Sequence, residues 1–368
     1  MKKILITLGA TGGHIFPAIS LLEAIEDLNK GFDVRLVNTS NSKVTIPNLK
    51  NNNTLYKINS VGFVGKSLLY KIKSLYSLLL SVIQSIKIMV NFKPNIIIGT
   101  GGFVSLPIAL SGLILNKKIY IVEGNSVPGL SNKIIALFCK KIFINFDETQ
   151  KYFGEKKCIK SGFPIRKLKI NNELNKDVDV LILGGSQGSK ILNNKIGDSV
   201  YRLLQKVGKT QGRIAKFKII HQCGLGNKVK IESLYSDIKK EFPFFEFQVY
   251  EFINNIEVYY QRSKILISRA GASTIAESLH FNILSIYVPI KNSSGNHQYL
   301  NAEEISKKEL GFMSLEEESS ELFIIKIYNL LYNQSTRNTM QSAMIRNAKV
   351  YNSDSAKNII KGILEDDR

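Results

Sequence analysis

A histidine stands directly after a glycine-rich turn near the start of the chain. The stretch LGATGGHIFPA places His14 behind Gly12 and Gly13, and an apolar run, Ile4–Leu8, precedes the turn. A strand, a glycine turn and a helix in succession would put this imidazole on the first helical turn. A helix N-terminus disfavours the protonated ring, and a neutral imidazole accepts a proton from a hydroxyl group. The alternative is that His14 only holds the turn by a hydrogen bond.

Similar turns follow apolar runs at three further places. They occur in NIIIGTGGFVSLP, DVLILGGSQGSKILN and ILISRAGASTIAES, which begin at Asn95, Asp179 and Ile265. Glycine exposes backbone N–H groups and the following helix adds a partial positive charge, so such a turn suits a phosphate. One turn alone serves a simple connection as readily. Four of them, in both halves of the chain, favour a ligand that carries a diphosphate.

The last of these turns also carries a carboxylate. Glu277 lies one helical turn beyond Ser273 and Thr274, where it would accept the hydroxyls of a ribose. The amides of Ala272 to Thr274 would face a diphosphate. The structural alternative is a capping box formed by Thr274 and Glu277. No GxxxxGK[ST] motif occurs, and the second strand ends near Asn38 without an acidic residue, which argues against NAD or FAD.

Composition narrows the functional classes further. The chain has 368 residues, a formal net charge of +20 and three scattered cysteines, Cys139, Cys158 and Cys223. This cysteine pattern predicts a reduced compartment and no disulfide framework. The charge suits phosphorylated substrates or an anionic membrane, and codon bias explains it equally well. The sequence has neither a block of basic residues nor a module of stacking aromatic residues, so it does not indicate nucleic-acid binding.

Short apolar strands alternate with helical patterns along the whole chain. This alternation predicts parallel sheets covered by helices on both faces, with ligands at the carboxyl ends of the strands. We expect two domains, residues 1–165 and 166–346, joined by the polar stretch Lys167–Asp179, with the second sheet starting at Val180. The helix over residues 347–368 is expected to pack back on the first domain.

A long apolar helix is expected between Lys66 and Pro94. One stripe is assigned to the core: Leu68, Ile72, Leu75, Leu79, Ile83, Ile86 and Val90. A second set would form an apolar edge ringed by lysines that docks on anionic lipid, joined by Leu113–Lys118. That set is Leu69, Tyr76, Leu80, Lys66, Lys71, Lys73 and Lys87. The alternative is a fully buried helix. The sequence contains no uninterrupted apolar run of about 20 residues, so no membrane-spanning helix is predicted.

Several motifs in order resemble the MurG family of bacterial glycosyltransferases: GATGGHIFPA, GTGGFVSLP, EGNSVPGLSNK, GFPIR, GGSQGSKILN, EFINNIEVYY, RAGASTIAE and HQYLNA. The resemblance implies a GT-B fold, in which two Rossmann-like domains with parallel sheets face across a cleft. It implies an inverting transfer of N-acetylglucosamine from UDP-N-acetylglucosamine to the 4-hydroxyl of the MurNAc-pentapeptide of undecaprenyl-pyrophosphate lipid I. The product is lipid II for peptidoglycan synthesis. The alternative is another enzyme of this architecture, such as a UDP-N-acetylglucosamine 2-epimerase.

The resemblance also implies roles for individual residues. His14, assisted by Glu123, would be the catalytic base. Asn125 and Gln298 would contact the sugar, and Arg166 would reach the nucleotide. Ile253 would hold uracil through its backbone. The complete set of implied donor-binding residues is Thr11, Gly12, Gly13, Asn125, Arg166, Ser186, Asn193, Ile253, Ala272, Ser273, Thr274, Glu277 and Gln298.

The resemblance extends to cofactors and location. It implies no required cofactor, with a divalent cation at most a stimulant, and a peripheral enzyme on the cytoplasmic face of the cell membrane with other cell-wall synthesis proteins as partners. The DVD sequence at Asp177–Asp179 resembles a metal-binding DxD motif, but it precedes a strand and is assigned a structural role. The chain departs from the family pattern at four positions: Phe103, Gly124, Ser273 and His297.

Overall fold

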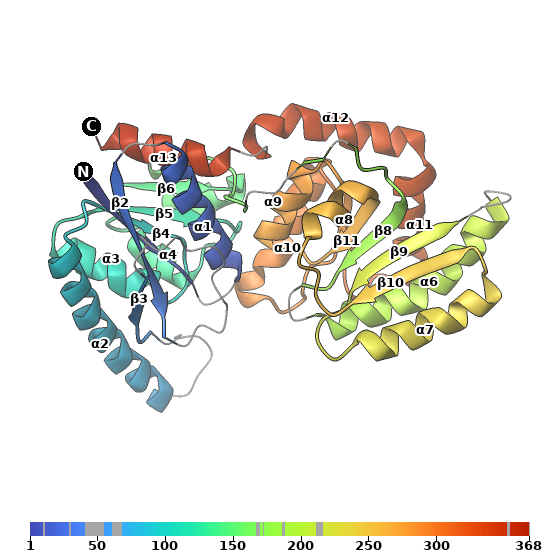
Figure 1. Ribbon diagram of the computed structural model, residues 1–368, viewed down its shortest axis with the longest axis horizontal. Helices are drawn as coiled ribbons and strands as arrows, with labels where there is room; N and C mark the ends of the chain where they lie inside the picture. The colour runs from blue at the N-terminus through green and yellow to red at the C-terminus, as the bar shows by residue number, and fades with distance from the viewer. Residues whose placement is uncertain are drawn as a thin grey trace. The chain divides into compact units, whose positions relative to one another are not determined.

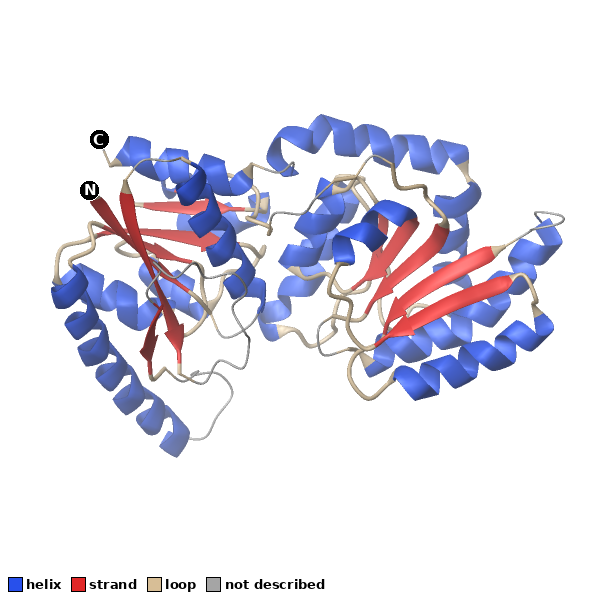
Figure 2. Ribbon diagram, in the orientation of Figure 1, coloured by secondary structure: helices blue, strands red, loops and turns tan. Residues whose placement is uncertain are grey.

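A computed structural model shows the chain as two compact α/β units (Figure 1). The first comprises Met1–Lys167 and Ser353–Arg368, and the second Leu168–Asn352. Each contains a parallel sheet with helices on both faces (Figure 2), so the predicted pair of Rossmann-like domains is confirmed. The structure describes residues 1–9, 12–28, 31–40, 55–60, 68–166, 170–171, 173–185, 188–210, 216–351 and 354–367.

The first unit is built on a seven-stranded sheet of order β3-β2-β1-β4-β5-β6-β7. Its strands are apolar runs buried on both faces, as parallel sheets require. The chain first extends the sheet on one side of β1 and then returns to the other side, which creates a switch point between β1 and β4. The strands are β1 Lys2–Thr7, β2 Phe32–Thr39, β3 Leu55–Ile58, β4 Ile96–Gly99, β5 Lys118–Glu123, β6 Lys141–Ile144 and β7 Cys158–Lys160.

Helices from both ends of the chain cover this sheet. The last helix packs against α1, and its end is held by ion pairs from Asp367 to Lys2 at 2.5 Å and Lys118 at 2.7 Å. The Tyr120 hydroxyl donates to Asp366 at 2.8 Å. The helices are α1 Gly12–Asp27, α2 Leu68–Phe92, α3 Ser105–Ile114, α4 Leu130–Ile135, α5 Gln150–Phe153 and α13 Ser355–Asp366.

The second unit contains a six-stranded parallel sheet of order β10-β9-β8-β11-β12-β13, with its switch point between β8 and β11. The strands are β8 Val178–Leu183, β9 Phe217–Gln222, β10 Phe245–Tyr250, β11 Ser263–Ser268, β12 Leu284–Tyr287 and β13 Phe312–Met313. The helices are α6 Lys190–Thr210, α7 Lys228–Glu241, α8 Ile256–Arg262, α9 Ala272–His280, α10 His297–Lys307, α11 Ser320–Tyr332 and α12 Gln334–Tyr351. Strand β8 thus starts two residues before the expected Val180.

The inward face of α2 differs from the prediction. The residues expected in the core at Leu75, Leu79, Ile83 and Val90 are 56%, 57%, 52% and 53% exposed. Among the side chains of residues 74–92, the buried ones are instead Ser74, Ser81, Ser85, Met89 and Phe92. Of the remaining positions in that prediction, Lys66 and the side chains of Leu68, Leu69, Lys71, Ile72 and Lys73 lie outside the described residues.

Small hydroxyl side chains explain this orientation. The Ser85 hydroxyl donates to the backbone oxygen of Ser81 at 2.6 Å, and Ser111 of α3 donates to the backbone oxygen of Val82 at 3.1 Å. Serines that bond to helix carbonyls need no other partner and let a neighbouring helix approach closely. The helix therefore turns its serine face to α3 and its larger apolar side chains outward.

We expect Ser85→Leu to lower the free energy of unfolding by about 1–3 kcal/mol, because the added side chain overpacks a closed helix contact. The matched change Leu79→Ser, on the outward face, should alter it by less than about 0.5 kcal/mol. Denaturant unfolding of the two variants measures both values. A larger loss for Leu79→Ser than for Ser85→Leu would contradict the observed orientation of α2.

Candidate active site

His14 lies in the first turn of α1 and is held by the residue that follows β4. Its Nδ1 lies 2.8 Å from the backbone oxygen of Thr100. A carbonyl oxygen only accepts, so Nδ1 carries the proton and Nε2 is left as a proton acceptor. The Thr100 hydroxyl lies 2.8 Å from the backbone oxygen of Thr7 and 3.0 Å from that of His14. These contacts fix the imidazole at the switch point of the first sheet.

The second glycine turn makes room for this ring. Gly101 has a φ of +96°, and a Cβ there would lie 2.9 Å from Cε1 of His14. The Gly101 amide donates to the Ser105 hydroxyl at 3.1 Å, and that hydroxyl lies 2.7 Å from Oγ1 of Thr7. The Gly101 amide is therefore hydrogen-bonded within the protein. The turn leaves the space that the imidazole of His14 occupies.

Glu123, the last residue of β5, is 4% exposed and surrounded by donors. Its Oε1 accepts from the Asn125 amide at 2.9 Å. Its Oε2 accepts from the Gly129 amide at 3.1 Å and from Nδ2 of Asn132 at 2.9 Å. The carboxylate thus shapes the loop that presents Asn125. Since Nδ1 of His14 donates to a backbone carbonyl, this geometry favours a positioning role for Glu123 over the expected assistance to the base.

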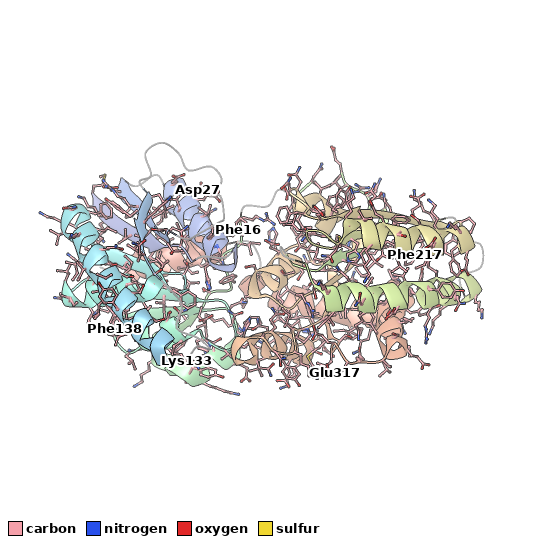
Figure 3. The ribbon with its side chains drawn as sticks, turned by 90° about the horizontal axis from the view of Figure 1, so that it is seen from below. Phe16, Asp27, Lys133, Phe138, Phe217 and Glu317 are labelled. Carbon is pink, nitrogen blue, oxygen red and sulfur yellow. The ribbon has the colours of Figure 1, made fainter. Side chains whose placement is uncertain are left out.

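Arg166 lies over the aromatic ring of Phe16 on α1, with 5.1 Å between the guanidinium carbon and the ring centroid. Phe16 lies near the start of α1, and Asp27 is the last residue of the same helix (Figure 3). The cation–π contact holds the arginine beside the helix turn that carries His14. Gly12 and Gly13 open this helix, whereas Thr11 lies outside the described residues.

In the second unit, Arg269 connects the loops on either side of the switch point. It follows β11, and its guanidinium donates to the hydroxyl of Ser189, in the loop after β8. It also donates to the backbone oxygen of Val288 at 3.0 Å and pairs with Glu316 at 2.6 Å. The segments that follow β8 and β11 are thereby joined at the carboxyl ends of neighbouring strands. Ser186 itself lies outside the described residues.

Gln222, the last residue of β9, connects three loops. Its Nε2 donates to the backbone oxygen of Gly185 at 3.0 Å, and its Oε1 accepts from the Ile253 amide at 2.9 Å. Its own backbone oxygen accepts from the Gly184 amide at 3.1 Å. The Ile253 amide is therefore already engaged, so any backbone contact of this residue with a nucleobase falls to its carbonyl oxygen.

Asn193 supports the same loops from below. Its Nδ2 donates to the backbone oxygen of Cys223 at 2.9 Å, so its Oδ1 accepts from Nε2 of His221 at 3.1 Å. The Tyr235 hydroxyl then donates to Nδ1 of His221 at 2.9 Å. Asn193 is 3% exposed, and its side chain holds protein groups. This arrangement gives Asn193 a positioning role beneath the loops rather than a place on their surface.

Helix α9 presents its N-terminus at the switch point. Gly271 is the N-cap, and the first helical hydrogen bond runs from the Ile275 amide to the Gly271 oxygen at 3.0 Å. The amides of residues 272–274 therefore precede the helical ladder, as an anion site requires. With Gly271 as N-cap, the alternative of a capping box between Thr274 and Glu277 is wrong.

The side chains of Glu277 and Gln298 have partners inside the second unit. Oε2 of Glu277, which is 8% exposed, accepts from the Tyr260 hydroxyl at 3.1 Å. Oε1 of Gln298, at the start of α10, accepts from the Ile290 amide at 3.2 Å and so orders the loop after β12. Both residues lie in segments that follow the carboxyl ends of strands, where the sequence predicts donor contacts.

The acidic pair of the DVD sequence lies at the opposite ends of the strands. Asp177 accepts from Arg262 at 2.6 and 2.7 Å and from Lys218 at 3.1 Å, and hydrogen bonds from Arg262 hold the pKa of this carboxyl well below its usual range. Asp179 accepts from the Lys218 amide and from Lys264, both at 2.7 Å. The structural role expected of this motif is confirmed. Within the part of the chain that the structure describes, no group of three His, Cys, Asp or Glu side chains is placed to hold a metal ion.

The residues that support the loops were not predicted from the sequence, chiefly Thr100, Gln222, Tyr260 and Arg269. Gln222 and His221 had a detectable signal, because two polar side chains end the otherwise apolar run FKIIHQ. Tyr260 had none, since a tyrosine in a short helix is most often part of the core.

Burial of His221 makes stability depend on pH. Desolvation lowers the pKa of His221 to about 3, whereas an unfolded histidine titrates near 6.5. Below pH 6.5 the unfolded chain binds a proton that the folded chain does not, so stability falls as pH decreases toward 3, by up to about 1.4 kcal/mol per pH unit. We expect His221→Gln to flatten the unfolding free energy between pH 6.5 and 5, measured by denaturant titration. Equal slopes for variant and parent would contradict this.

Comparison with known proteins places this geometry in a family. The chain matches the N-terminal domain of glycosyltransferase family 28 over residues 4–144 and the C-terminal domain over residues 179–361. It is 33% identical over 378 residues to the UDP-N-acetylglucosamine--N-acetylmuramyl-(pentapeptide) pyrophosphoryl-undecaprenol N-acetylglucosamine transferase of a Sulfurihydrogenibium species, with 100% of this chain and 99% of the relative covered.

Two solved structures share the fold. MurG of Acinetobacter baumannii has a TM-score of 0.77 at 20% identity, over 99% of this chain and 100% of that one. A UDP-GlcNAc 2-epimerase of Neisseria meningitidis, bound to UDP-GlcNAc, has a TM-score of 0.67 at 12% identity, over 99% and 100%. At these sequence identities the two structures show only that the fold is shared. The family is shown by the Sulfurihydrogenibium relative, which matches over the full length. The chain belongs to glycosyltransferase family 28, in the group of N-acetylglucosamine transferases that includes MurG.

Proposed function

We propose that this chain transfers N-acetylglucosamine from UDP-N-acetylglucosamine to the 4-hydroxyl of the MurNAc-pentapeptide of lipid I, with inversion, and so produces lipid II. Its full-length relatives, which are named for this transfer, support the reaction class. The observation that carries the proposal is the hydrogen bond from Nδ1 of His14 to Thr100, because it leaves Nε2 as a base beside a glycine turn.

The reaction is a single displacement. Nε2 of His14 takes the proton of the acceptor hydroxyl while that oxygen forms a bond to the anomeric carbon. The bond between this carbon and the β-phosphate oxygen breaks, and its electron pair leaves with UDP. No redox change occurs and no cofactor takes part in this scheme, although a divalent cation would stimulate it by shielding the leaving phosphate.

Most of the donor contacts belong to the second unit in this proposal. The amides of residues 272–274 and of the loop containing Ser186 would bind the diphosphate and stabilise its developing charge. Glu277 would accept the ribose hydroxyls, and the carbonyl of Ile253 would bind uracil. Asn125, Arg166 and Gln298 would contact the sugar and nucleotide, while Glu123 and Asn193 would act by positioning these loops.

A UDP-GlcNAc 2-epimerase shares the fold of this chain, so epimerase activity needs a separate test. An epimerase converts UDP-N-acetylglucosamine without an acceptor, whereas a transferase releases UDP only when an acceptor hydroxyl is present. Incubation of the protein with the donor alone, and then with a lipid I analogue, distinguishes the two. Appearance of the 2-epimer in the first reaction would support the epimerase.

Membrane docking of the first unit is the second part of the proposal. The outward face of α2 and the end of α3 present seven apolar side chains that are 49–63% exposed: Leu75, Tyr76, Leu79, Ile83, Val90 and, on α3, Leu113 and Ile114. Exposed Lys87 and Lys93 adjoin them on the chain. An apolar surface with flanking lysines suits an anionic bilayer. We propose peripheral binding at the cytoplasmic face, where a lipid-linked acceptor is accessible.

Part of α2 is also long and apolar enough to cross a membrane, which the sequence did not predict. Ser74–Phe92 has a mean hydropathy of 1.5 with 22% of the window buried, so by length and composition it would suffice to cross a membrane. The serine face of α2 is bonded to α3 and to the segment after β3, where Gln84 accepts from the Asn59 amide at 2.9 Å. This packing favours a helix that lies on the bilayer as part of the unit.

His14→Ala should reduce turnover of UDP-N-acetylglucosamine with a lipid I analogue by roughly 10²–10⁴-fold, since that is the usual contribution of a general base. UDP binding, measured by calorimetry, should stay within about threefold of the parent protein, because residues other than His14, most of them in the second unit, provide those contacts in this proposal. Turnover near the parent level in a variant that binds UDP normally would exclude His14 as the base.

The double change Leu79→Ser/Ile83→Ser should reduce flotation with vesicles of 30% phosphatidylglycerol by roughly tenfold, because it removes two apolar anchors. Val229→Ser, at an 80% exposed position of α7 in the second unit, is the matched control and should float like the parent. Equal flotation of the double variant and the parent would contradict docking through α2.

A further inference from the structure

We propose that Tyr260 is a specificity-determining positioning residue for the ribose of the donor, acting through Glu277. This inference rests on the proposed function, which assigns the ribose hydroxyls to Glu277. The Tyr260 hydroxyl lies 3.1 Å from Oε2 of Glu277, and both side chains are buried, at 1% and 8% exposure. A hydroxyl that donates to a buried carboxylate forms a charge-assisted hydrogen bond with defined geometry.

The tyrosine is itself held rigidly. Its ring stacks on that of Phe281, with centroids 5.3 Å apart and planes inclined by 21°. Phe281 directly follows α9, the helix that carries Glu277. Tyr260 thus contacts α9 at Glu277 and at Phe281, one helical turn later, so its hydroxyl has little freedom to leave the carboxylate.

The same packing connects the ribose contact to the nucleobase contact. Tyr260 belongs to a core cluster with Ile253 and Ile256, the residues around the start of α8. The loop after β10 and helix α9 therefore share one buried support. In this position Tyr260 holds one carboxylate oxygen of Glu277 and sets the direction in which the rest of the group accepts the ribose diol.

The hydroxyl also determines what Glu277 accepts. A carboxylate has about four lone-pair positions, and the tyrosine occupies one of them on Oε2. Loss of this donor removes one of the bonds that set the direction of the carboxylate, and alignment with two adjacent hydroxyls needs a more exact direction than contact with a single hydroxyl. The loss should therefore fall on the 2′-hydroxyl discrimination of the site more than on nucleotide binding in general.

The test measures the dissociation constants of UDP and 2′-deoxy-UDP for the full-length protein by calorimetry. The parent should bind UDP about tenfold or more tightly than 2′-deoxy-UDP, since a lost buried hydrogen bond to a charged group has this size. Tyr260→Phe keeps the stacked ring and should reduce that ratio to about threefold or less, with binding of 2′-deoxy-UDP little changed.

Tyr259→Phe is the matched control. Tyr259 is the adjacent residue of α8, and its hydroxyl bonds to that of Tyr250 at 3.0 Å instead of to Glu277. It should keep the parent ratio. Equal weakening of both nucleotides by Tyr260→Phe, or an unchanged ratio, would overturn the inference and leave the ribose role of Glu277 standing. A parent protein that binds both nucleotides equally would instead contradict the ribose contact of Glu277, and the inference with it.

Discussion

The hydrogen bond from His14 to the Thr100 carbonyl is the interaction on which the proposed chemistry of the first unit depends. It exists because β1 and β4 are neighbours in the sheet although about 90 residues separate them in the chain. The return of the chain to the other side of β1 leaves the two strand ends side by side with their helices diverging. One strand end then supplies the ring and the other a fixed acceptor for Nδ1, so the fold determines the tautomer.

The second unit uses the same topology for a different purpose. Its switch point lies between β8 and β11, whose following loops are joined by Arg269 and Ser189. Here the strand ends contribute backbone amides, while the side chains beneath them hold the loops in place. Gln222 and the buried network around His221 hold these loops while their side chains stay buried. In the proposed function, two copies of one topology therefore provide a proton acceptor in one unit and an anion site in the other.

The sequence predicted the parallel sheets and the glycine turns because both depend on local patterns, apolar runs and residues without a Cβ. It did not predict the orientation of α2, since hydropathy assigns leucines to the core while the serines obtain their burial from bonds to helix carbonyls. The short edge strands β7 and β13 have three and two residues, too few to show a period. The role of Glu123 depends on donors from the following loop and from helix α4, up to nine residues later, which no motif encodes.

The departure from the family pattern at Gly124 has a physical cause within the first unit. A Cβ at this position would lie 2.4 Å from Cε2 of Phe163, whose ring is 6% exposed. The ring fills the volume that a longer side chain at residue 124 would need, so any sugar contact from such a side chain must come from elsewhere. The backbone of Gly124 is still fixed, because Nδ2 of Asn145 donates to its oxygen at 3.3 Å. Glycine at position 124 therefore preserves the loop geometry that presents Asn125, and only the side chain at position 124 is absent.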